Sequence, residues 1–139
     1  MMRPWRIMVL AIAAAAVAGL VSACSSPAGP APPAPLELTQ AESVSTQSLQ
    51  AGQEVRIVLD ANPTTGYQWT VDGPVPAQVE RVGDPQFTPA SDAMGAGGSE
   101  VWTFLAKSVG EGTLTMKYWR SFEPTVPPLE EFRVVLRVK

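Results

Sequence analysis

The stretch EVRIVLDANPTTGYQWTV, residues 54–71, contains two β-strand patterns with a turn between them. In its first half, Val55, Ile57 and Leu59 occupy every second position, so one face of a strand carries all three. Its second half, YQWTV, is rich in the aromatic and β-branched residues that strands favour. The proline and glycine of NPTTG separate the halves, so the stretch predicts two successive strands joined by a short connection.

The same period of two recurs in later and earlier segments, most clearly in 100–106, 113–119 and 131–138, and more weakly in 36–40, 43–49 and 77–83. In the last strong segment one face is expected to hold Phe132, Val134, Leu136 and Val138, and the other Arg133 and Arg137. From residue 36 onward, no stretch of ten or more residues keeps a helical period. The chain is therefore predicted to be all-β, an immunoglobulin-like antiparallel β-sandwich of about seven to eight strands.

The lengths of the connections point to one end of this sandwich. If each strand runs opposite to the one before it, successive connections after residue 54 alternate between the two ends. The first, third and fifth connections, residues 61–66, 84–99 and 120–130, then share one end, and the shorter 72–77 and 108–112 share the other. Long connections without internal structure are uncommon unless they bind something, so we predict a binding face at the first end.

The residues in these connections suit a protein interface. Gly95, Gly97 and Gly98 give the third connection a backbone that can approach another surface closely. Arg120 and Phe122 in the fifth are of the types enriched in interface hot spots. Singly, each has another explanation, because glycines often only form turns and an aromatic ring can fill the core.

The N-terminal segment indicates export and lipidation. Residues 1–23 have the layout of a secretory signal, with two arginines before an apolar run that ends in small residues. The letters VSA before Cys24 resemble the bacterial lipobox, in which the cysteine after the cleavage site is lipidated; ordinary cleavage with a spare thiol is the alternative. The Pro- and Ala-rich residues 24–35 predict an extended tether, so the folded domain is expected over 36–139, anchored to the bacterial cell envelope outside the cytoplasm.

Composition excludes several function classes. The chain of 139 residues has no histidine, so mechanisms that use an imidazole as base or metal ligand are excluded, and no side chain with its ordinary pKa titrates between about pH 5.5 and 7.5. Loss of Arg3 and Arg6 with the signal leaves 8 of the 10 basic residues against 13 acidic ones, a net charge of −5. This charge argues against nucleic acid as a partner. No cofactor, metal site or disulfide is predicted.

Three motifs together resemble the chagasin-like inhibitors of papain-type cysteine peptidases. NPTTGY at 62–67 resembles the first inhibitory loop of that family, and GAGGSEVWTF at 95–104 its glycine-rich second loop with the strand that follows. YWRSFEP, ending at residue 124, is similar to the third loop, although Ser121 and Phe122 stand where the family has proline and tryptophan. The resemblance covers most of residues 50–138.

This resemblance implies a reversible, monomeric peptidase inhibitor rather than an enzyme. The first loop (residues 62–67), the second loop (92–99) and the third loop (119–124) are then expected to enter the active-site cleft as a wedge, with the first loop nearest the catalytic cysteine. The implied peptidase-binding residues are Asn62, Pro63, Thr64, Thr65, Gly66, Tyr67, Gly95, Gly97, Gly98, Arg120 and Phe122.

The first loop has the composition of a rigid and chemically inert segment. Pro63 has a fixed φ, and the β-branched Thr64 and Thr65 are stiff at χ1. Gly66 allows a backbone turn that other residues adopt only with strain, and Asn62 can hydrogen-bond the local backbone. Such a loop fills a cleft without presenting a bond for nucleophilic attack, and little order is lost on binding.

Two other function classes stay open at this point. A cell-surface adhesion or carbohydrate-binding lipoprotein could use Trp119 and Phe122 as a stacking platform. An enzyme of the glycosidase type needs a pair of carboxylates. The spacing singles out no pair among the available candidates, which are Asp92, Glu100, Glu123 and Glu130.

Overall fold

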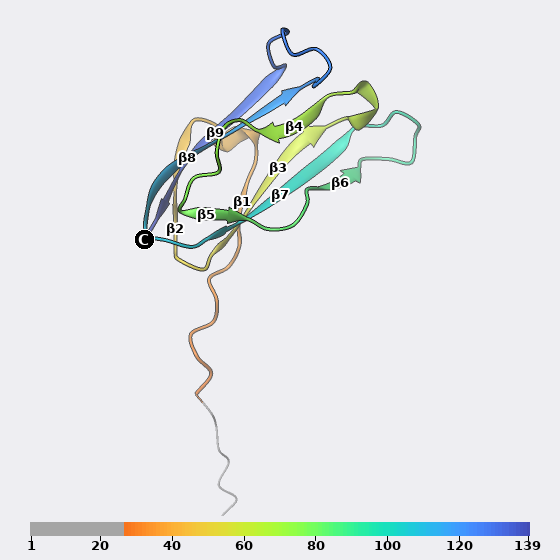
Figure 1. The fold of residues 1–139 in the computed structure, drawn as a ribbon. Helices are drawn as coiled ribbons and strands as arrows, with labels where there is room; N and C mark the ends of the chain where they lie inside the picture. The colour runs from red at the N-terminus through yellow and green to blue at the C-terminus, as the bar shows by residue number, and fades with distance from the viewer. Residues whose placement is uncertain (1–26) are drawn as a thin grey trace, which may run out of the picture.

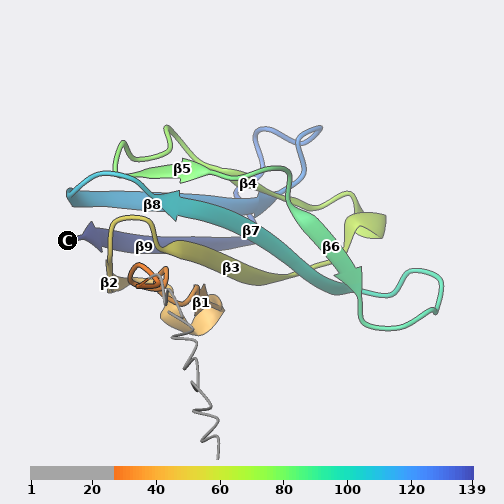
Figure 2. The ribbon, with the colours of Figure 1, turned by 90° about the horizontal axis from the view of Figure 1, so that it is seen from below.

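The structure, a computed structural model, describes residues 27–139 as an immunoglobulin-like sandwich of two β-sheets (Figure 1 and Figure 2). The five-stranded sheet contains β1 (Leu36–Leu38), β3 (Glu54–Ala61), β5 (Val79–Arg81), β6 (Gln86–Pro89) and β7 (Gly98–Ala106). The four-stranded sheet contains β2 (Ser45–Leu49), β4 (Gln68–Val71), β8 (Gly110–Trp119) and β9 (Glu130–Val138). Two short 3₁₀ turns, η1 (Gln40–Glu42) and η2 (Pro63–Thr65), lie in the connections.

The core lies between the inner faces of the two sheets and follows the predicted alternation. In β9 the four apolar residues named above are buried, while Arg133 and Arg137 are exposed. The largest side chains with almost no exposed surface are Phe104, Phe132, Leu38, Leu49, Ile57, Leu59, Leu114, Met116 and Leu136. Burial of each such side chain contributes about 1.5–3 kcal/mol. Among residues 27–139, no polar or charged residue is fully buried, so apolar contact holds the sheets together.

Two strand pairs differ from the predicted antiparallel arrangement. β1 pairs with β3 in parallel, and β2 pairs with β9 in parallel, whereas the other pairs are antiparallel. The chain crosses from one sheet to the other between β1 and β2, and again between β2 and β3. Since β2 runs back in the opposite sheet, β1 and β3 point the same way. The prediction assumed that successive strands are antiparallel neighbours, and it did not consider strands that cross between the sheets.

The described chain contains nine strands, rather than seven to eight, for two reasons. The weak patterns at 36–40, 43–49 and 77–83 all contain strands, namely β1, β2 and β5. In addition, β6 lies inside the predicted connection 84–99. All four of its residues are exposed, so burial imposes no alternation on them, and Pro89 is tolerated because β6 is an edge strand.

The three long connections gather at one end of the sandwich, as the alternation of strand direction predicts. β3, β6 and β8 all run toward this end, which lies at the upper right of Figure 1. The first, second and third loops follow these strands in turn. The shorter connections between β2 and β3, β4 and β5, and β7 and β8 lie toward the opposite end.

The chain enters the domain from the end opposite to the three loops (Figure 1). Residues 27–35 have no regular secondary structure and are mostly exposed. The Gln53 side-chain amide donates a hydrogen bond to the Ala34 carbonyl at 2.8 Å, which holds the end of this segment beside the β2–β3 connection. The predicted signal 1–23 and Cys24 lie outside the described residues. In the described range, no helix is long and apolar enough to span a membrane.

One backbone position outside the loops is strained. Val44, between η1 and β2, has a φ of 63°, a left-handed conformation that is unfavourable for a β-branched residue. Its amide donates to the Arg133 carbonyl at 2.5 Å, and its side chain is 84% exposed. The hydrogen bond to β9 therefore stabilises a backbone conformation that is strained for valine. Burial of the Val44 side chain does not offset this strain, because the side chain is exposed.

Val44→Asn is expected to stabilise the domain, since asparagine adopts the left-handed conformation more readily than valine. Relief of about 1 kcal/mol corresponds to a rise of about 4–8 °C in Tm for a domain of this size. Thermal unfolding by circular dichroism measures it. Val109→Asn is the control, because Val109 is also exposed, at 74%, but is not among the described residues with positive φ. An equal rise in both variants would show that polarity, and not strain, is responsible.

Candidate functional site

The first loop is a single closed 3₁₀ turn. Asn62 caps it: the side-chain Oδ1 accepts hydrogen bonds from the Thr64 amide at 3.2 Å and from the Thr64 hydroxyl at 2.6 Å. The Thr65 hydroxyl donates to the Asn62 carbonyl at 2.7 Å, and Pro63 stands at the start of the turn. The predicted hydrogen bonding of Asn62 to the local backbone is therefore confirmed.

Gly66 ends this turn, and both its backbone conformation and its closeness to Phe122 favour glycine there. Its φ of 79° and ψ of −2° lie in the left-handed region, and its amide donates to the Pro63 carbonyl at 3.1 Å. A Cβ atom at this position would lie 3.0 Å from Cε1 and 3.1 Å from Cζ of Phe122. The glycine thus allows both the backbone turn and the close approach of the third loop.

The second loop is joined to the first by an amide side chain. The Asn62 Nδ2 donates to the Gly95 carbonyl at 3.1 Å. Gly95 has a φ of 76° and belongs to a turn closed by the Ala96 amide and the Ala93 carbonyl at 3.1 Å. The tip of the second loop therefore has a defined position relative to the first.

The third loop is joined to the first by Arg120. Its Nε donates to the Thr65 carbonyl at 3.1 Å, and its guanidinium carbon lies 4.4 Å from the centre of the Tyr67 ring. Its Nη1 pairs with Glu123 at 3.3 Å, and the Glu123 amide donates back to the Arg120 carbonyl at 3.1 Å. Most of the guanidinium's contacts thus lie inside the site, so Arg120 positions the loops whether or not it also contacts a partner.

Stacked aromatic rings at the start of β4 and the end of β8 support the first loop. The Tyr67 and Tyr118 rings stack with centroids 5.3 Å apart, and the Tyr118 and Trp69 rings with centroids 5.1 Å apart. The hydroxyl of Tyr118 accepts a hydrogen bond from the Asn62 amide at 2.8 Å, and the Trp69 indole donates to the Asp60 carbonyl at 2.9 Å. The period of two in residues 113–119 puts Tyr118 on one face with Leu114 and Met116, but the motifs did not assign it to the site. Its position at the loop end of β8 was the available signal.

The second loop is shorter than predicted because Gly98 and Ser99 belong to β7. Gly98 lies opposite both Ala61 in β3 and Pro89 in β6. A Cβ atom on Gly98 would lie 2.0 Å from the Thr88 carbonyl oxygen, so this glycine permits the close pairing of β6 and β7. Gly98 therefore serves the fold, and of the three glycines Gly95 is the one that lies at the exposed tip.

The aromatic residues of the third loop lie on different surfaces. Phe122 is 67% exposed, so it does not fill the core, and one edge of its ring rests against Gly66. Trp119 is only partly exposed: its indole donates to the Thr70 hydroxyl at 2.9 Å, and the Lys117 Nζ lies 4.3 Å from the ring centre. Lys117 thus occupies one face of the Trp119 ring, so the two aromatic residues do not form one free stacking platform.

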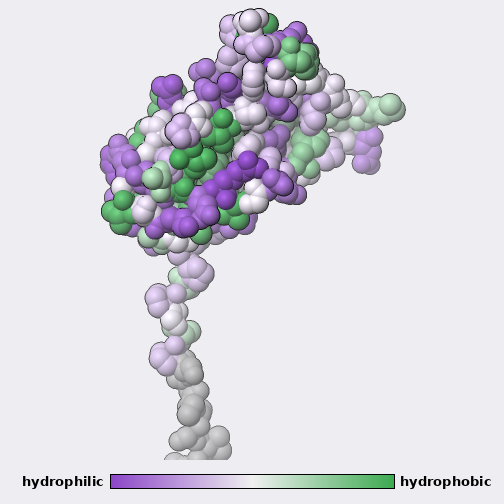
Figure 3. Space-filling view, viewed as in Figure 1, coloured by the Kyte–Doolittle hydropathy of each residue, from purple (hydrophilic) through white to green (hydrophobic). Residues whose placement is uncertain are grey.

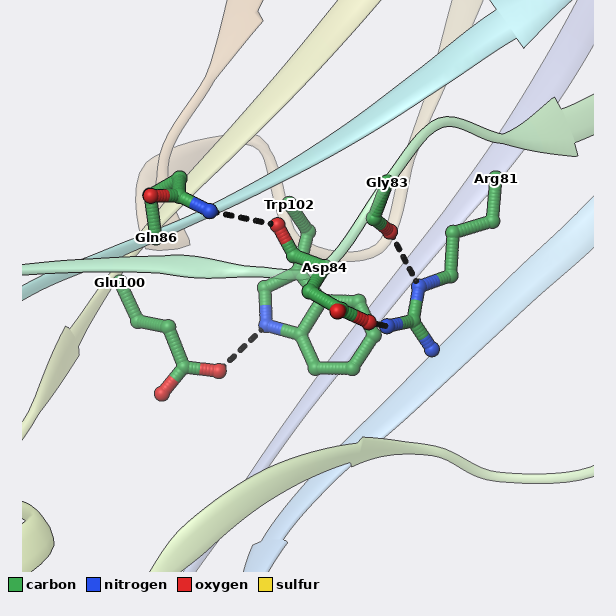
Figure 4. A network of polar contacts seen from close by, with 6 residues as sticks. All are labelled: Arg81, Gly83, Asp84, Gln86, Glu100 and Trp102. Carbon is green, nitrogen blue, oxygen red and sulfur yellow. Dashed lines mark hydrogen bonds and ion pairs between the residues drawn. The ribbon is translucent and has the colours of Figure 1, made fainter.

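Two of the four candidate carboxylates are engaged by other side chains of the domain. Glu123 is paired with Arg120, and Glu100 accepts a hydrogen bond from the Trp102 indole at 2.7 Å (Figure 4). Partial burial raises the pKa of Glu100, and the Trp102 hydrogen bond opposes this rise. Across residues 27–139, no group of three or more potential ligands is placed to bind a metal ion.

Glu100 belongs to a polar network that joins β7 to β5, β6 and the segment between them (Figure 4). The Arg81 guanidinium lies 4.8 Å from the centre of the Trp102 ring, donates to the Gly83 carbonyl at 3.0 Å and pairs with Asp84 at 3.0 Å. These contacts hold the segment between β5 and β6 over Trp102. The network therefore fixes the edge strand that leads into the second loop.

The site as a whole is a protrusion and not a hollow. The first loop and Phe122 are exposed at the loop end, and the second loop extends beyond the rest of the sandwich in Figure 2. A cavity of about 320 Å³ is present in the described domain, but none of its lining residues, Ser43, Val44, Glu131 and Arg133, belongs to the three loops. This shape suits insertion into a cleft on another protein better than binding of a small ligand.

Comparisons with known proteins identify what the chain is similar to. Residues 48–136 match the model of the chagasin family of peptidase inhibitors. Chagasin of Trypanosoma cruzi is 30% identical over 105 residues, which cover 73% of this chain and 96% of chagasin. The crystal structure of a cysteine protease inhibitor from Entamoeba histolytica has a TM-score of 0.68 at 22% identity, over 76% of this chain and 96% of that one. PbICP-C, solved in complex with falcipain-2, has the same fold with a TM-score of 0.52 at 18% identity, over 77% of this chain and 100% of that one.

Tyr118→Phe is expected to loosen the first loop without removing the aromatic stack. The Asn62 amide then loses its acceptor, which costs about 1 kcal/mol of stability. Hydrogen exchange at the Asn62 amide should become faster, and urea unfolding should report the lost stability. Tyr67→Phe is the control, because its ring belongs to the same stack, whereas the hydroxyl that binds the Asn62 amide is that of Tyr118. Unchanged exchange at Asn62 in Tyr118→Phe would show that the hydroxyl does not support the loop.

Proposed function

The chain belongs to the chagasin family of peptidase inhibitors, and on this premise we propose how it inhibits papain-like cysteine peptidases. The first, second and third loops enter the active-site cleft together as one reversible wedge, with the first loop nearest the catalytic cysteine. Family membership makes the chain an inhibitor and not an enzyme. The observation that carries the proposal is that Asn62 and Arg120 join the first loop to both of its neighbours.

The hydrogen bonds of the first loop explain why a peptidase would not cleave it. The Asn62, Pro63 and Thr65 carbonyl oxygens already accept hydrogen bonds from within the site. Nucleophilic attack requires a carbonyl that is correctly placed against the nucleophile and free to turn toward stabilising donors. The Asn62 and Pro63 carbonyls are held within the closed turn instead, and the Thr65 carbonyl is held by Arg120. The loop therefore fills the cleft without reaching a geometry suited to attack.

The same contacts reduce the cost of binding. A loop that is already ordered loses little conformational freedom on association, so more of the contact energy appears as affinity. The loss of proline at Ser121 is compensated locally, because the Glu123 amide and side chain both bond to Arg120 and close the third loop. We assign direct peptidase contact to the exposed first loop, the Gly95 tip and Phe122, and a supporting role to Gly97 and Gly98.

For the N-terminal part we propose a lipid anchor on Cys24 that holds the inhibitor, as a monomer, in the bacterial cell envelope with the domain facing outside the cytoplasm. Two observations on the described residues support this. Residues 27–35 are mostly exposed and irregular, and they leave the domain at the end opposite to the loops (Figure 1). An extended tether of residues 24–35 spans about 35–40 Å, so the loops would face away from the membrane and remain free to meet a peptidase.

Gly66→Val is expected to weaken inhibition of papain by at least about tenfold, which corresponds to 1.4 kcal/mol. Valine is strained at a φ of 79°, and its side chain would collide with Phe122. Inhibition constants measured by enzyme titration, with folding checked by circular dichroism, provide the test.

Gly52→Val is the matched control for this change. Gly52 has a similar φ of 84°, no atom lies within 4 Å of its Cβ position, and it sits in the β2–β3 connection at the far end of the sandwich. Both variants should lose stability by about 1–3 kcal/mol, but only the Gly66 variant should lose affinity. A folded Gly66→Val protein that inhibits as well as the parent would reduce NPTTGY to a simple turn.

Cys24→Ser is expected to abolish lipidation, since the thiol is the acceptor of the lipid. The variant should appear in the soluble fraction or persist as an unprocessed precursor, whereas Ser25→Ala should behave like the parent. Fractionation after an alkaline wash, followed by mass spectrometry of the N-terminus, checks both. A fully processed Cys24→Ser protein that stays on the membrane contradicts the anchor.

A further inference from the structure

Met94 stands at the corner of the turn that forms the tip of the second loop. The Ala96 amide donates to the Ala93 carbonyl at 3.1 Å, so Met94 and Gly95 are the two central residues of a β-turn. The Met94 side chain is fully exposed, at 102%. In Figure 3 the outermost end of the β6–β7 connection is coloured as apolar.

Apart from Met94, residues 27–139 have no exposed sulfur atom. Residues 27–139 contain one other methionine, Met116, which is 0% exposed in the core, and no cysteine. Oxidation of a thioether follows its exposure to the oxidant. An oxidant that reaches the folded domain therefore finds one accessible sulfur, and it lies at the loop end.

We propose that Met94 is a redox modification site through which hydroperoxides weaken the inhibitor; this rests on the proposed function above. Hydrogen peroxide transfers one oxygen atom to the thioether sulfur, which loses two electrons and becomes a sulfoxide. The O–O bond breaks, and the remaining oxygen leaves as water with both protons. Reduction by a thiol-dependent methionine sulfoxide reductase reverses the change.

The position of Met94 explains why this oxidation affects binding. Its neighbour Gly95 accepts a hydrogen bond from the Asn62 side chain, so the thioether is presented beside the first loop and not on a separate surface. When the wedge enters a cleft, this apolar side chain leaves water together with the first loop. A sulfoxide at the same place is polar, and its desolvation opposes binding unless the peptidase supplies a partner.

The experiment compares oxidised and untreated full chain in detergent solution, with papain as the probe peptidase. The protein is treated with hydrogen peroxide, the peroxide is removed with catalase before papain is added, and peptide mass mapping shows which methionines carry oxygen. Oxidised parent is expected to inhibit roughly tenfold more weakly than untreated parent. Met94→Leu should inhibit equally before and after peroxide, and the reductase with dithiothreitol should restore the oxidised parent.

Each remaining outcome decides against the inference. Equal inhibition by parent with and without mapped Met94 sulfoxide overturns it, as does an equal loss of potency in peroxide-treated Met94→Leu. Modification of buried Met116 before Met94 contradicts the selectivity on which it depends. If untreated parent fails to inhibit papain and other papain-like enzymes, the proposed function itself fails, and the inference with it.

Discussion

The geometry of the loop end depends on the hydrogen bonds of one residue, Asn62. Its backbone amide donates to the Tyr118 hydroxyl, its side-chain amide donates to the Gly95 carbonyl, and its side-chain oxygen caps the turn at Thr64. These contacts reach, respectively, the four-stranded sheet, the second loop and the first loop itself. A purely apolar side chain at this position could make only the backbone contact. The direction of the first loop is therefore set by the junction of both sheets and not by the local sequence alone.

Hydrogen bonding inside the site and inertness toward a peptidase are two consequences of the same arrangement. Each carbonyl that is occupied by a neighbouring donor stiffens the loop, and it is also less available for attack. Arg120 contributes to both effects, since it binds the Thr65 carbonyl while its charge rests on the Tyr67 ring and is paired with Glu123. The exposed groups at this end include small hydroxyls, glycine backbone, Phe122 and Met94. A surface of this kind binds mainly through shape complementarity. The sulfur of Met94 is its most chemically reactive atom.

Strands with one buried face could be predicted from the sequence, because burial imposes a period of two on β3, β8 and β9. The prediction failed for β6, where all four residues are exposed and nothing forces alternation. It also assigned the glycines of the second loop to surface contact, whereas Gly98 is needed because β6 passes closely over β7. That requirement comes from Thr88, a residue of another strand. The sequence of the loop alone therefore could not predict that glycine is needed at position 98.

The sequence by itself determined the two faces of the main strands, the closed turn of NPTTG and the end of the sandwich to which the three loops belong. These features depend on residues a few positions apart, or on a simple count of strand reversals. Only the tertiary structure decided that Tyr118 supports Asn62, 56 positions away, and that Arg120 reaches Thr65 across 55 positions. It also decided the parallel pairing of β1 with β3 and the packing of Phe122 on Gly66. Contacts of this kind depend on which strands pair and on how the two sheets are stacked, because only these arrangements bring such distant residues together, and no local pattern records them.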